Sequence, residues 1–308
     1  MQVILGANGV IGTGLAKNLT RYTDKVRLVS RNPRKVNAND ELIRADLTNP
    51  EQTLKAVEGA SVAYLTAGLK YDIKVWQVQW PMIMKNVIDA CIENNTKLVF
   101  FDNVYLYGKV DGWMTEESAV NPSSKKGEVR AKLSEMIFND INNGKLKALI
   151  ARAADFYGPN TPLSFVNAMV FERYRKHKKA QWLLNDDVLH SFTYTPDASI
   201  ATALLGNTES AFNRVWHLPT DKNVLNGKKF IEIIASEFHV EPKYLVIKKW
   251  MMKMLGLFNG IIGESVEMLY QSEYDYLFDS SKFEKTFNFQ PTSYKKGIEE
   301  TVQSMQHS

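Results

Sequence analysis

Short aliphatic and β-branched runs alternate with helical patterns along the first half of the chain. Five such runs predict strands, at residues 3–5, 26–29, 62–65, 98–101 and 148–150. Between them, apolar residues recur at spacings of three and four, which predicts helices at 10–19, 52–57, 75–94 and 124–142. Such alternation is typical of a parallel sheet covered by helices on both faces. We therefore predict an α/β fold with a Rossmann-type, doubly wound parallel sheet.

The pattern changes after residue 150, where prolines interrupt the chain, helices become shorter and no regular strand spacing persists. This predicts a main domain of residues 1–155 and a small C-terminal substrate lobe formed by residues 156–188 and 206–308. A compact helix is predicted after Pro196, so residues 189–205 are expected to return to the main domain. In such folds, ligands bind beyond the carboxyl ends of the strands.

Charge and cysteine content exclude several function classes. The 308 residues carry 38 Lys and Arg against 34 Asp and Glu, and the basic pairs are scattered, so no nucleic-acid partner is expected. The single cysteine, Cys91, lies in a helical apolar stripe and is expected to be a buried structural thiol in a reducing compartment. The five histidines lack metal-ligand spacing, so no metal site is expected.

Hydropathy gives no sign of a membrane segment. No apolar run approaches the ~20 residues that a membrane span needs, and no signal-peptide pattern is present at the start. Residues 251–262 are apolar but interrupted by polar residues and glycines, which predicts a helix and a turn in the lobe. We therefore expect a cytoplasmic protein without a membrane partner.

A G-x-x-G-x-x-G motif follows the first predicted strand and opens the first predicted helix. Gly6 permits the tight turn, Gly9 lets backbone N–H groups approach a pyrophosphate, and Gly12 lets the helix pack close to the sheet. This context favours a dinucleotide site over a glycine-rich turn without a ligand. The candidate cofactor-binding residues in this motif are Gly6, Asn8, Gly9, Val10, Ile11 and Gly12.

The residues after the second predicted strand bear on the choice of cofactor. A site that prefers NAD usually places an acidic residue there to bind the ribose 2′-hydroxyl. This chain has Ser30 and Arg31 instead, and an arginine can pair with a 2′-phosphate. We therefore predict NADP rather than NAD as the cofactor. The alternative is that Arg31 is an ordinary arginine on a solvated loop.

Further motifs, in this order, resemble those of the extended short-chain dehydrogenase/reductases, a family that includes NAD-dependent epimerase/dehydratases acting on nucleotide sugars. They are Asp46-Leu47-Thr48, Thr66-Ala67-Gly68-Leu69, and the segments 101–108, 152–159, 278–283 and 287–291. The resemblance implies that Asp46 and Leu47 meet the adenine ring. It also implies that Thr66, Ala67 and Gly68 border the ribose and phosphates of the cofactor.

The catalytic positions depart from the family pattern. The family has a Tyr-x-x-x-Lys pair on the helix after the fifth strand, in which the lysine also binds the nicotinamide ribose. Here Lys132 matches that lysine, but Glu128 stands four residues earlier. Glu128 is either a general base or an i,i+4 partner that pairs with Lys132 on the helix surface.

The family's substrate-binding serine is replaced by Asn103, four residues before Tyr107. On a continuing strand, Asn103, Tyr105 and Tyr107 would point to one face. Tyr107 either supports the fold by packing or contributes to catalysis. The candidate catalytic residues are therefore Lys132, Glu128, Asn103 and Tyr107.

The leading hypothesis is an NAD(P)-binding epimerase, dehydratase or reductase relative with an atypical active site, acting on a small polar substrate such as a nucleotide sugar. One alternative is a non-catalytic NADP-binding redox sensor or regulatory protein. Another is an enzyme whose acid–base help comes from the substrate or from water. Residues 190–194 either line the substrate site or form an ordinary lobe strand. The resemblance also implies a homodimer through the helices at 75–94 and 124–142.

Overall fold

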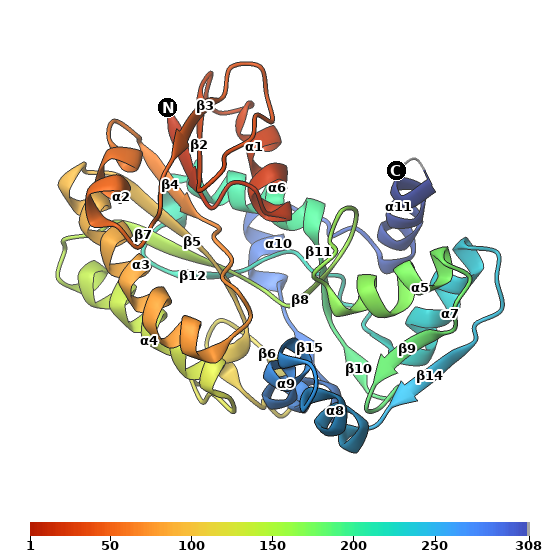
Figure 1. Ribbon diagram of the computed structural model, residues 1–308. Coiled ribbons are helices and arrows are strands. Elements are labelled where there is room, and N and C mark those ends of the chain that lie inside the picture. The colour runs from red at the N-terminus through yellow and green to blue at the C-terminus, as the bar shows by residue number, and fades with distance from the viewer. Residues whose placement is uncertain (307–308) are drawn as a thin grey trace.

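The computed structural model describes residues 1–306 and has a central sheet of seven parallel strands in the order β12-β7-β5-β4-β1-β2-β3 (Figure 1). Every neighbouring pair in this sheet is parallel. The strands are β1 (Gln2–Leu5), β2 (Val26–Ser30), β3 (Glu41–Arg44), β4 (Val62–Leu65), β5 (Lys97–Asn103), β7 (Ala148–Ala153) and β12 (Val215–His217). The predicted α/β fold with a doubly wound parallel sheet is therefore confirmed.

Helices cover both faces of the sheet (Figure 1). One apolar core contains residues of α2 (Pro50–Val57), α3 (Ile73–Glu93) and α4 (Lys125–Asn142) packed on the strands. The opposite core contains residues of α1 (Val10–Leu19), α6 (Thr195–Gly206) and α10 (Ser281–Phe287). The helix predicted after Pro196 is α6, and it packs against α1. The central strands are buried on both sides, which is why their sequences are continuously apolar.

Two strands of the sheet were not predicted. β3 alternates between partly buried and exposed residues because it forms the sheet edge, so it lacks a continuous apolar run. β12 pairs with β7 at the other edge, although its residues fall in the range expected to form the lobe. Both strands are short, and tertiary contacts rather than local pattern place them in the sheet.

The rest of the chain forms short paired strands and helices beyond the sheet. The paired strands are β6 (Trp113–Met114) with β15 (Leu277–Phe278), β8 (Asp155–Tyr157) with β11 (Phe192–Tyr194), β9 (Ala180–Leu183) with β14 (Tyr244–Ile247), and β10 (Leu189–His190) with β13 (Leu225–Asn226). Helices α5 (Glu172–Arg175), α7 (Gly227–Glu237) and α11 (Tyr294–Gln306) accompany them. A separate, aromatic-rich core holds much of this region together.

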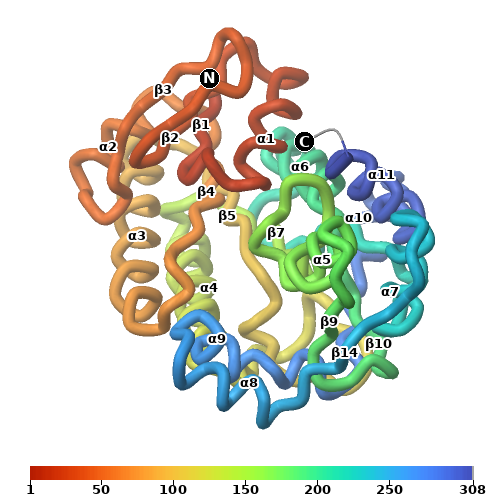
Figure 2. The backbone as a smooth tube through the Cα atoms, turned by 45° about the vertical axis from the view of Figure 1, so that its right-hand side comes forward, coloured from red at the N-terminus to blue at the C-terminus, as the bar shows by residue number. Residues whose placement is uncertain are grey.

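A short helical hairpin lies below the starts of α3 and α4 (Figure 2). It consists of α8 (Lys249–Gly256) and α9 (Gly260–Ser265), and the 3-10 helix η4 (Val266–Ser272) follows it. The hairpin corresponds to the helix and turn predicted at 251–262. No helix within residues 1–306 is long and apolar enough to cross a membrane.

Cys91 is buried in the core under α3, as predicted. Burial raises the pKa of its thiol to about 12. The thiol is therefore a structural apolar group rather than a nucleophile.

Candidate active site

The glycine motif forms a tight turn between β1 and α1. Gly6 has a φ of 96°, and a Cβ atom there would lie 2.4 Å from the Cα of Ala67. A Cβ atom on Gly12 would lie 2.8 Å from the carbonyl oxygen of Ala7. At Gly9, by contrast, a Cβ atom would have no neighbour closer than 4.0 Å. Gly6 and Gly12 are therefore required by packing, whereas Gly9 faces open space.

The first turn of α1 has unused hydrogen-bond donors. Gly9 is its N-cap, and no side chain caps it. The backbone N–H groups at a helix start have no partners within the helix. Together with the helix dipole, they form a site that favours an anion such as a pyrophosphate.

The loop after β2 lies beside this turn. The side-chain amide of Asn8 donates to the carbonyl of Asn32 at 2.7 Å, and the backbone N–H of Asn32 donates to Ser30 Oγ at 3.2 Å. Arg31 is exposed. Hydrogen bonds from Thr48 lower the pKa of Asp46, and the positive charge of Arg31 contributes to this shift. Arg31 and Asp46 therefore lie near each other at the outer end of the site.

The loop after β4 completes the wall next to Gly6. The backbone N–H of Thr66 donates to Leu5 at 2.9 Å, and its hydroxyl donates to the carbonyl of Gly6 at 3.3 Å. Ala67 packs against Gly6, and Gly68 has open space where a side chain would be. On the other side of Asp46, Leu47 is buried, and its carbonyl accepts a hydrogen bond from Asn86 of α3.

Helix α4 turns Lys126 and Arg130 inward, and it turns Glu128 and Lys132 outward. Lys126 is fully buried and Arg130 is 6% exposed. Glu128 and Lys132 are exposed and line an open hollow on the outer surface of α4. At 3.6 residues per turn, a residue two positions along a helix lies on nearly the opposite side. No ion pair joins Glu128 to Lys132 within residues 1–306, so the expected surface pairing is not present.

Arg130 belongs to a buried network at the end of β5. Its guanidinium lies 3.5 Å from Asp102, stacks over the rings of Trp76 and Trp80, and leaves its Nε and one terminal nitrogen without hydrogen-bond partners. Asp102 also accepts hydrogen bonds from Arg152 at 3.2 and 3.3 Å. Two guanidinium groups thus share one carboxylate, and unpaired donors remain on Arg130.

Tyr107 joins this network through Arg152. Its hydroxyl accepts a hydrogen bond from Arg152 at 2.7 Å and lies 2.9 Å from His217 Nε2. Burial raises the pKa of this phenol. Strand β5 ends at Asn103, and Tyr105–Tyr107 form a 3-10 turn, so the strand alternation expected for Asn103, Tyr105 and Tyr107 does not extend past residue 103.

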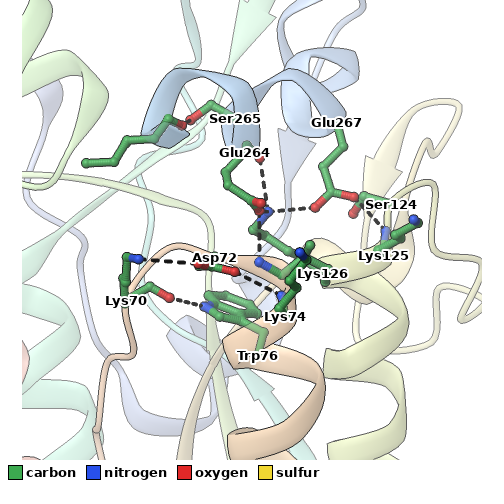
Figure 3. A network of polar contacts seen from close by, with 12 residues as sticks. Lys70, Asp72, Lys74, Trp76, Ser124, Lys125, Lys126, Glu264, Ser265 and Glu267 are labelled. Atoms are coloured by element: carbon green, nitrogen blue, oxygen red, sulfur yellow. Dashed lines mark hydrogen bonds and ion pairs between the residues drawn. The ribbon is translucent and has the colours of Figure 1, made fainter. Parts of the chain in front are cut away.

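Lys126 joins α4 to η4 and α9 (Figure 3). Its ammonium lies 2.6 Å from the carboxylate of Glu264 and 2.7 Å from that of Glu267. The same carboxylates accept the backbone N–H groups of Ile73 and Lys125, the first residues of α3 and α4, at 2.9 and 2.8 Å. Glu264 and Glu267 therefore hold α9 and η4 against the starts of both helices, where the helix dipoles favour a negative charge.

A group of phenols surrounds the end of β5. Asn103 Oδ1 accepts the backbone N–H of Tyr105 at 3.1 Å, and its amide nitrogen has no hydrogen-bond partner within residues 1–306. Burial raises the pKa of Tyr105 well above its usual value, and Tyr71 and Asp155 add to the shift. Burial likewise raises the pKa of Tyr71, which lies close to Tyr105 and Asp155. The phenols are therefore protonated at neutral pH and act as hydrogen-bond donors.

Asp155 links these phenols to the lobe. It lies 3.0 Å from His190 Nε2, at the end of the short strand β10. Its negative charge also raises the pKa of Tyr270 and Tyr276, although burial is the main cause. The hydroxyls of Tyr270 and Tyr276 are buried and without hydrogen-bond partners of normal geometry. Unpaired buried polar groups are costly, and they commonly mark a place where a ligand binds.

Sequence reasoning missed Lys126, Arg130, Tyr71, Tyr270 and Tyr276. A signal for the first two was available, because Val129, Leu133 and Ile137 form the apolar stripe of α4 and Lys126 and Arg130 lie along the same side. The tyrosines are brought to Asp155 from distant parts of the chain, which no local pattern indicates.

Comparisons with known proteins agree with the fold. Two Arabidopsis thaliana 3β-hydroxysteroid-dehydrogenase/decarboxylases, isoforms 2 and 1, are 22% identical over 99% of this chain. The chain spans 62% of the length of isoform 2 and 79% of that of isoform 1.

Solved structures match along the whole chain. The UDP-glucuronic acid 4-epimerase of Bacillus cereus, in complex with NAD, has a TM-score of 0.82 at 17% identity and covers 100% of this chain and 99% of its own. A dTDP-glucose 4,6-dehydratase of Streptomyces venezuelae, with NAD bound, has a TM-score of 0.81 at 14% identity and covers 100% and 98%. Residues 2–211 match the family described as the NAD dependent epimerase/dehydratase family. The chain therefore belongs to the NAD-dependent epimerase/dehydratase family.

Proposed function

We propose that this chain binds a pyridine dinucleotide, NADP(H) in preference to NAD(H), and transfers hydride to or from a small polar substrate at the carboxyl edge of the sheet. The observation that carries the proposal is the start of α1, where no side chain caps the backbone N–H groups. It lies beside the tight turn at Gly6, where a Cβ atom would clash with Ala67. Donors without partners, next to open space at Gly9, fit a pyrophosphate. Family membership and the NAD complexes of similar folds support the same cofactor class.

Each of the remaining candidate residues is assigned to one part of the cofactor. Arg31 and Ser30 would hold the 2′-phosphate, which is why we favour NADP(H), and Asp46 and Leu47 would meet the adenine. Thr66, Ala67 and Gly68 would border the ribose and phosphates. The role expected of Lys132, contact with the nicotinamide ribose, is assigned to Arg130, because Arg130 is on the inward face of α4 and retains unpaired donors.

Bound nicotinamide supplies hydride transfer, and the residues around it must manage the substrate oxygen and its proton. Asn103 has a free amide donor at the place where the family has serine. Tyr105 is a protonated phenol next to it, suited to donate a proton rather than to accept one. With Arg130 assigned the role of the family's lysine, Lys126, one turn earlier on the same face, takes the role of its tyrosine in place of Glu128. Glu128 is exposed on the outer face of α4, so we do not assign it the role of base.

The polar group around Asp155 is the proposed substrate site. Tyr270 and Tyr276 offer hydrogen-bond donors there, and His190 holds Asp155 in place. Such a lining suits a molecule rich in hydroxyl groups, such as a nucleotide sugar. The similar structures include proteins in complex with UDP-glucose and UDP-glucuronic acid, which supports this class.

One observation favours a second candidate, a non-catalytic NADP-binding sensor. The amine of Lys126, to which we assign the place of the family's tyrosine, is bound by two carboxylates, so it is not free to assist a substrate in this conformation. The other rival, acid–base help from the substrate or from water, requires turnover without any of the residues named above.

The test compares binding and turnover in matched variants. We expect NADPH binding by calorimetry, and NADP(H)-dependent turnover with a member of a panel of sugar nucleotides, carbonyls and alcohols. Arg130→Gln should weaken NADPH binding about tenfold or more, because it removes charge-assisted hydrogen bonds worth roughly 1.5–3 kcal/mol. Lys132→Gln, on the outer face, should leave binding unchanged.

Each other result has a definite meaning. Tight NADPH binding without turnover would favour the sensor. No binding of either dinucleotide at millimolar concentration would refute the proposal altogether. If Lys132→Gln rather than Arg130→Gln weakened binding, our assignment of the ribose contact would be wrong.

A further inference from the structure

The α8–α9 hairpin exposes a row of large apolar side chains. Leu257 and Phe258, at its tip, are 81% and 88% exposed, and Trp250 is 63% exposed. Met254, Leu255 and Ile261 are also exposed on the two helices. Single exposed apolar residues are normal on a protein surface, but six on one hairpin form a patch of the kind that marks an interaction site.

The two helices of the hairpin are already packed closely against each other. Gly256 and Gly263 bring its two helices into close contact, since a Cβ atom on Gly256 would lie 2.9 Å from the Cα of Gly263. Met252 faces inward, in a small core with Ile247 and Leu269. One side of the hairpin thus packs on the rest of the chain, and the apolar side chains of its other side are exposed to solvent.

The free charge of this segment is of one sign. Residues 244–265 contain Lys248, Lys249 and Lys253 and one carboxylate, Glu264, which is paired with Lys126. Lys249 is paired with Glu273, outside the segment, which leaves Lys248 and Lys253 beside the apolar row. Lys74, at the start of α3, is also exposed, and its backbone N–H donates to Asp72 (Figure 3).

We propose that the α8–α9 hairpin is an interfacial anchor that docks on the surface of an anionic lipid bilayer. Trp, Phe, Leu and Ile side chains next to lysines are the composition of segments that lie in the headgroup region, where the apolar groups insert and the lysines meet lipid phosphates. The hairpin is too short to span a bilayer, in keeping with the absence of a spanning helix within residues 1–306. The lack of a spanning run in the sequence therefore does not exclude a membrane partner.

A second copy of the chain fits the patch less well. In a two-fold symmetric dimer the same surface meets itself, which would bring the lysines of one copy against those of the other. The one carboxylate of the hairpin, Glu264, is already paired with Lys126, so this arrangement is repulsive. An anionic surface meets the same lysines with attraction.

Docking would have a defined orientation relative to the active site. Glu264 belongs to α9 and contacts Lys126 and the start of α3. The lipid surface would therefore face the end of the molecule where α3 and α4 begin.

The test is flotation of the full chain with phosphatidylglycerol-containing vesicles and with pure phosphatidylcholine vesicles. We expect binding to the anionic vesicles that weakens as salt is raised. Phe258→Asp and Lys253→Glu should each weaken it, Phe258→Asp by about tenfold or more, because a large apolar group no longer enters the bilayer. Leu163→Asp is the matched control: Leu163 is 98% exposed but lies outside the hairpin, so binding should be unchanged.

Three results would overturn the proposal: no flotation with anionic vesicles, equal loss in the Phe258→Asp and Leu163→Asp variants, or a chain that is dimeric in light scattering and becomes monomeric only with Phe258→Asp. The last would identify a second copy as the occupant. Because Phe258 is exposed, its replacement should leave the thermal unfolding midpoint unchanged, so that a loss of binding is not a loss of folding.

Discussion

The ammonium of Lys126 lies 2.6 Å from the carboxylate of Glu264, 138 residues later in the chain. The same carboxylate accepts the first backbone N–H of α3, so one acidic side chain of α9 joins the hairpin to the starts of α3 and α4. The Lys126 side chain is fully buried, whereas Glu264 and Glu267 keep about a quarter of their side-chain surface exposed. The contact is thus a clamp between α4 and the α9–η4 segment, and its two carboxylates remain partly accessible to solvent.

Lys126→Met should loosen this clamp. We expect a loss of about 1–3 kcal/mol in the free energy of unfolding, less than the 3–5 kcal/mol typical of a fully buried pair, because the carboxylates can turn to solvent. Urea unfolding measures the loss, and amide hydrogen exchange should rise in residues 260–272. Lys125→Met is the matched control, because only the backbone of Lys125 contacts Glu267. Equal effects of the two variants would show that the clamp adds no stability.

Gly9→Ser should separate folding from cofactor binding. The backbone of Gly9 is extended, and serine is a better N-cap than glycine, so stability should be unchanged or rise by a few tenths of a kcal/mol. The serine hydroxyl would accept the N–H groups intended for pyrophosphate, so the Kd for dinucleotide should rise about tenfold or more. Calorimetry and thermal unfolding measure the two quantities. A destabilised variant that still binds would contradict the expectation.

Gly12→Ala is the opposite case. Its Cβ atom would lie 2.8 Å from the Ala7 backbone, so α1 must shift away from the sheet. We expect a loss of about 1–3 kcal/mol of stability, the usual range for overpacking. A fully stable Gly12→Ala variant would mean that this close approach is not required.

Arg31→Ala tests the cofactor preference. The Kd for NADPH should rise about tenfold or more, because a charge-assisted phosphate contact is lost, while the Kd for NADH should change little. Arg34→Ala is the control, since Arg34 is a nearby exposed arginine of the same loop. If the wild-type chain bound NADH more tightly than NADPH, the preference that we propose would be wrong.

Stability should fall in mild acid because of His217. Burial, together with the charge of Arg152, lowers the pKa of His217 well below its usual value, so the folded chain holds this histidine neutral. The unfolded chain takes up a proton as the pH falls through about 6.5, and stability should then decline by up to about 1.4 kcal/mol per pH unit. Above that pH the contribution to the slope vanishes.

Urea unfolding of His217→Asn between pH 7.5 and 5 checks this slope. The variant should be less stable at neutral pH, because it loses the contact with Tyr107, but it should show a shallower decline in acid. His177→Asn, at an exposed histidine, should retain the wild-type slope. The same decline in the His217 variant and the wild type would assign the pH dependence to other groups.

The expected homodimer through α3 and α4 can be tested on the outer face of α3. Val78 and Met82 are exposed there, one helical turn apart. Met82→Asp should convert a dimer into a monomer in light scattering, because a carboxylate would be buried without a partner in the interface. A wild-type chain that is monomeric at high concentration would refute the dimer.

Local pattern was sufficient for the central strands and for the helices that cover the sheet. Strand β4 and helix α1 have the predicted bounds. A strand buried on both faces has a continuous apolar run, and a helix that packs on one side has apolar residues at spacings of three and four, so both are easily recognised. The signal fails for β3, which has one neighbour and alternating exposure, and for β12, which is three residues long.

The sequence by itself determined the parallel sheet and the glycine turn, since both depend on residues close together in the chain. It also indicated that the usual tyrosine is missing. Only the tertiary structure decided which side of α4 faces the site, and so placed Lys126 and Arg130 inward and Glu128 and Lys132 outward. Likewise, Glu264 meets Lys126, and Tyr276 comes to Asp155, only because folding brings distant segments together. Burial and electrostatic contact depend on distance in space, which spacing along a chain does not fix.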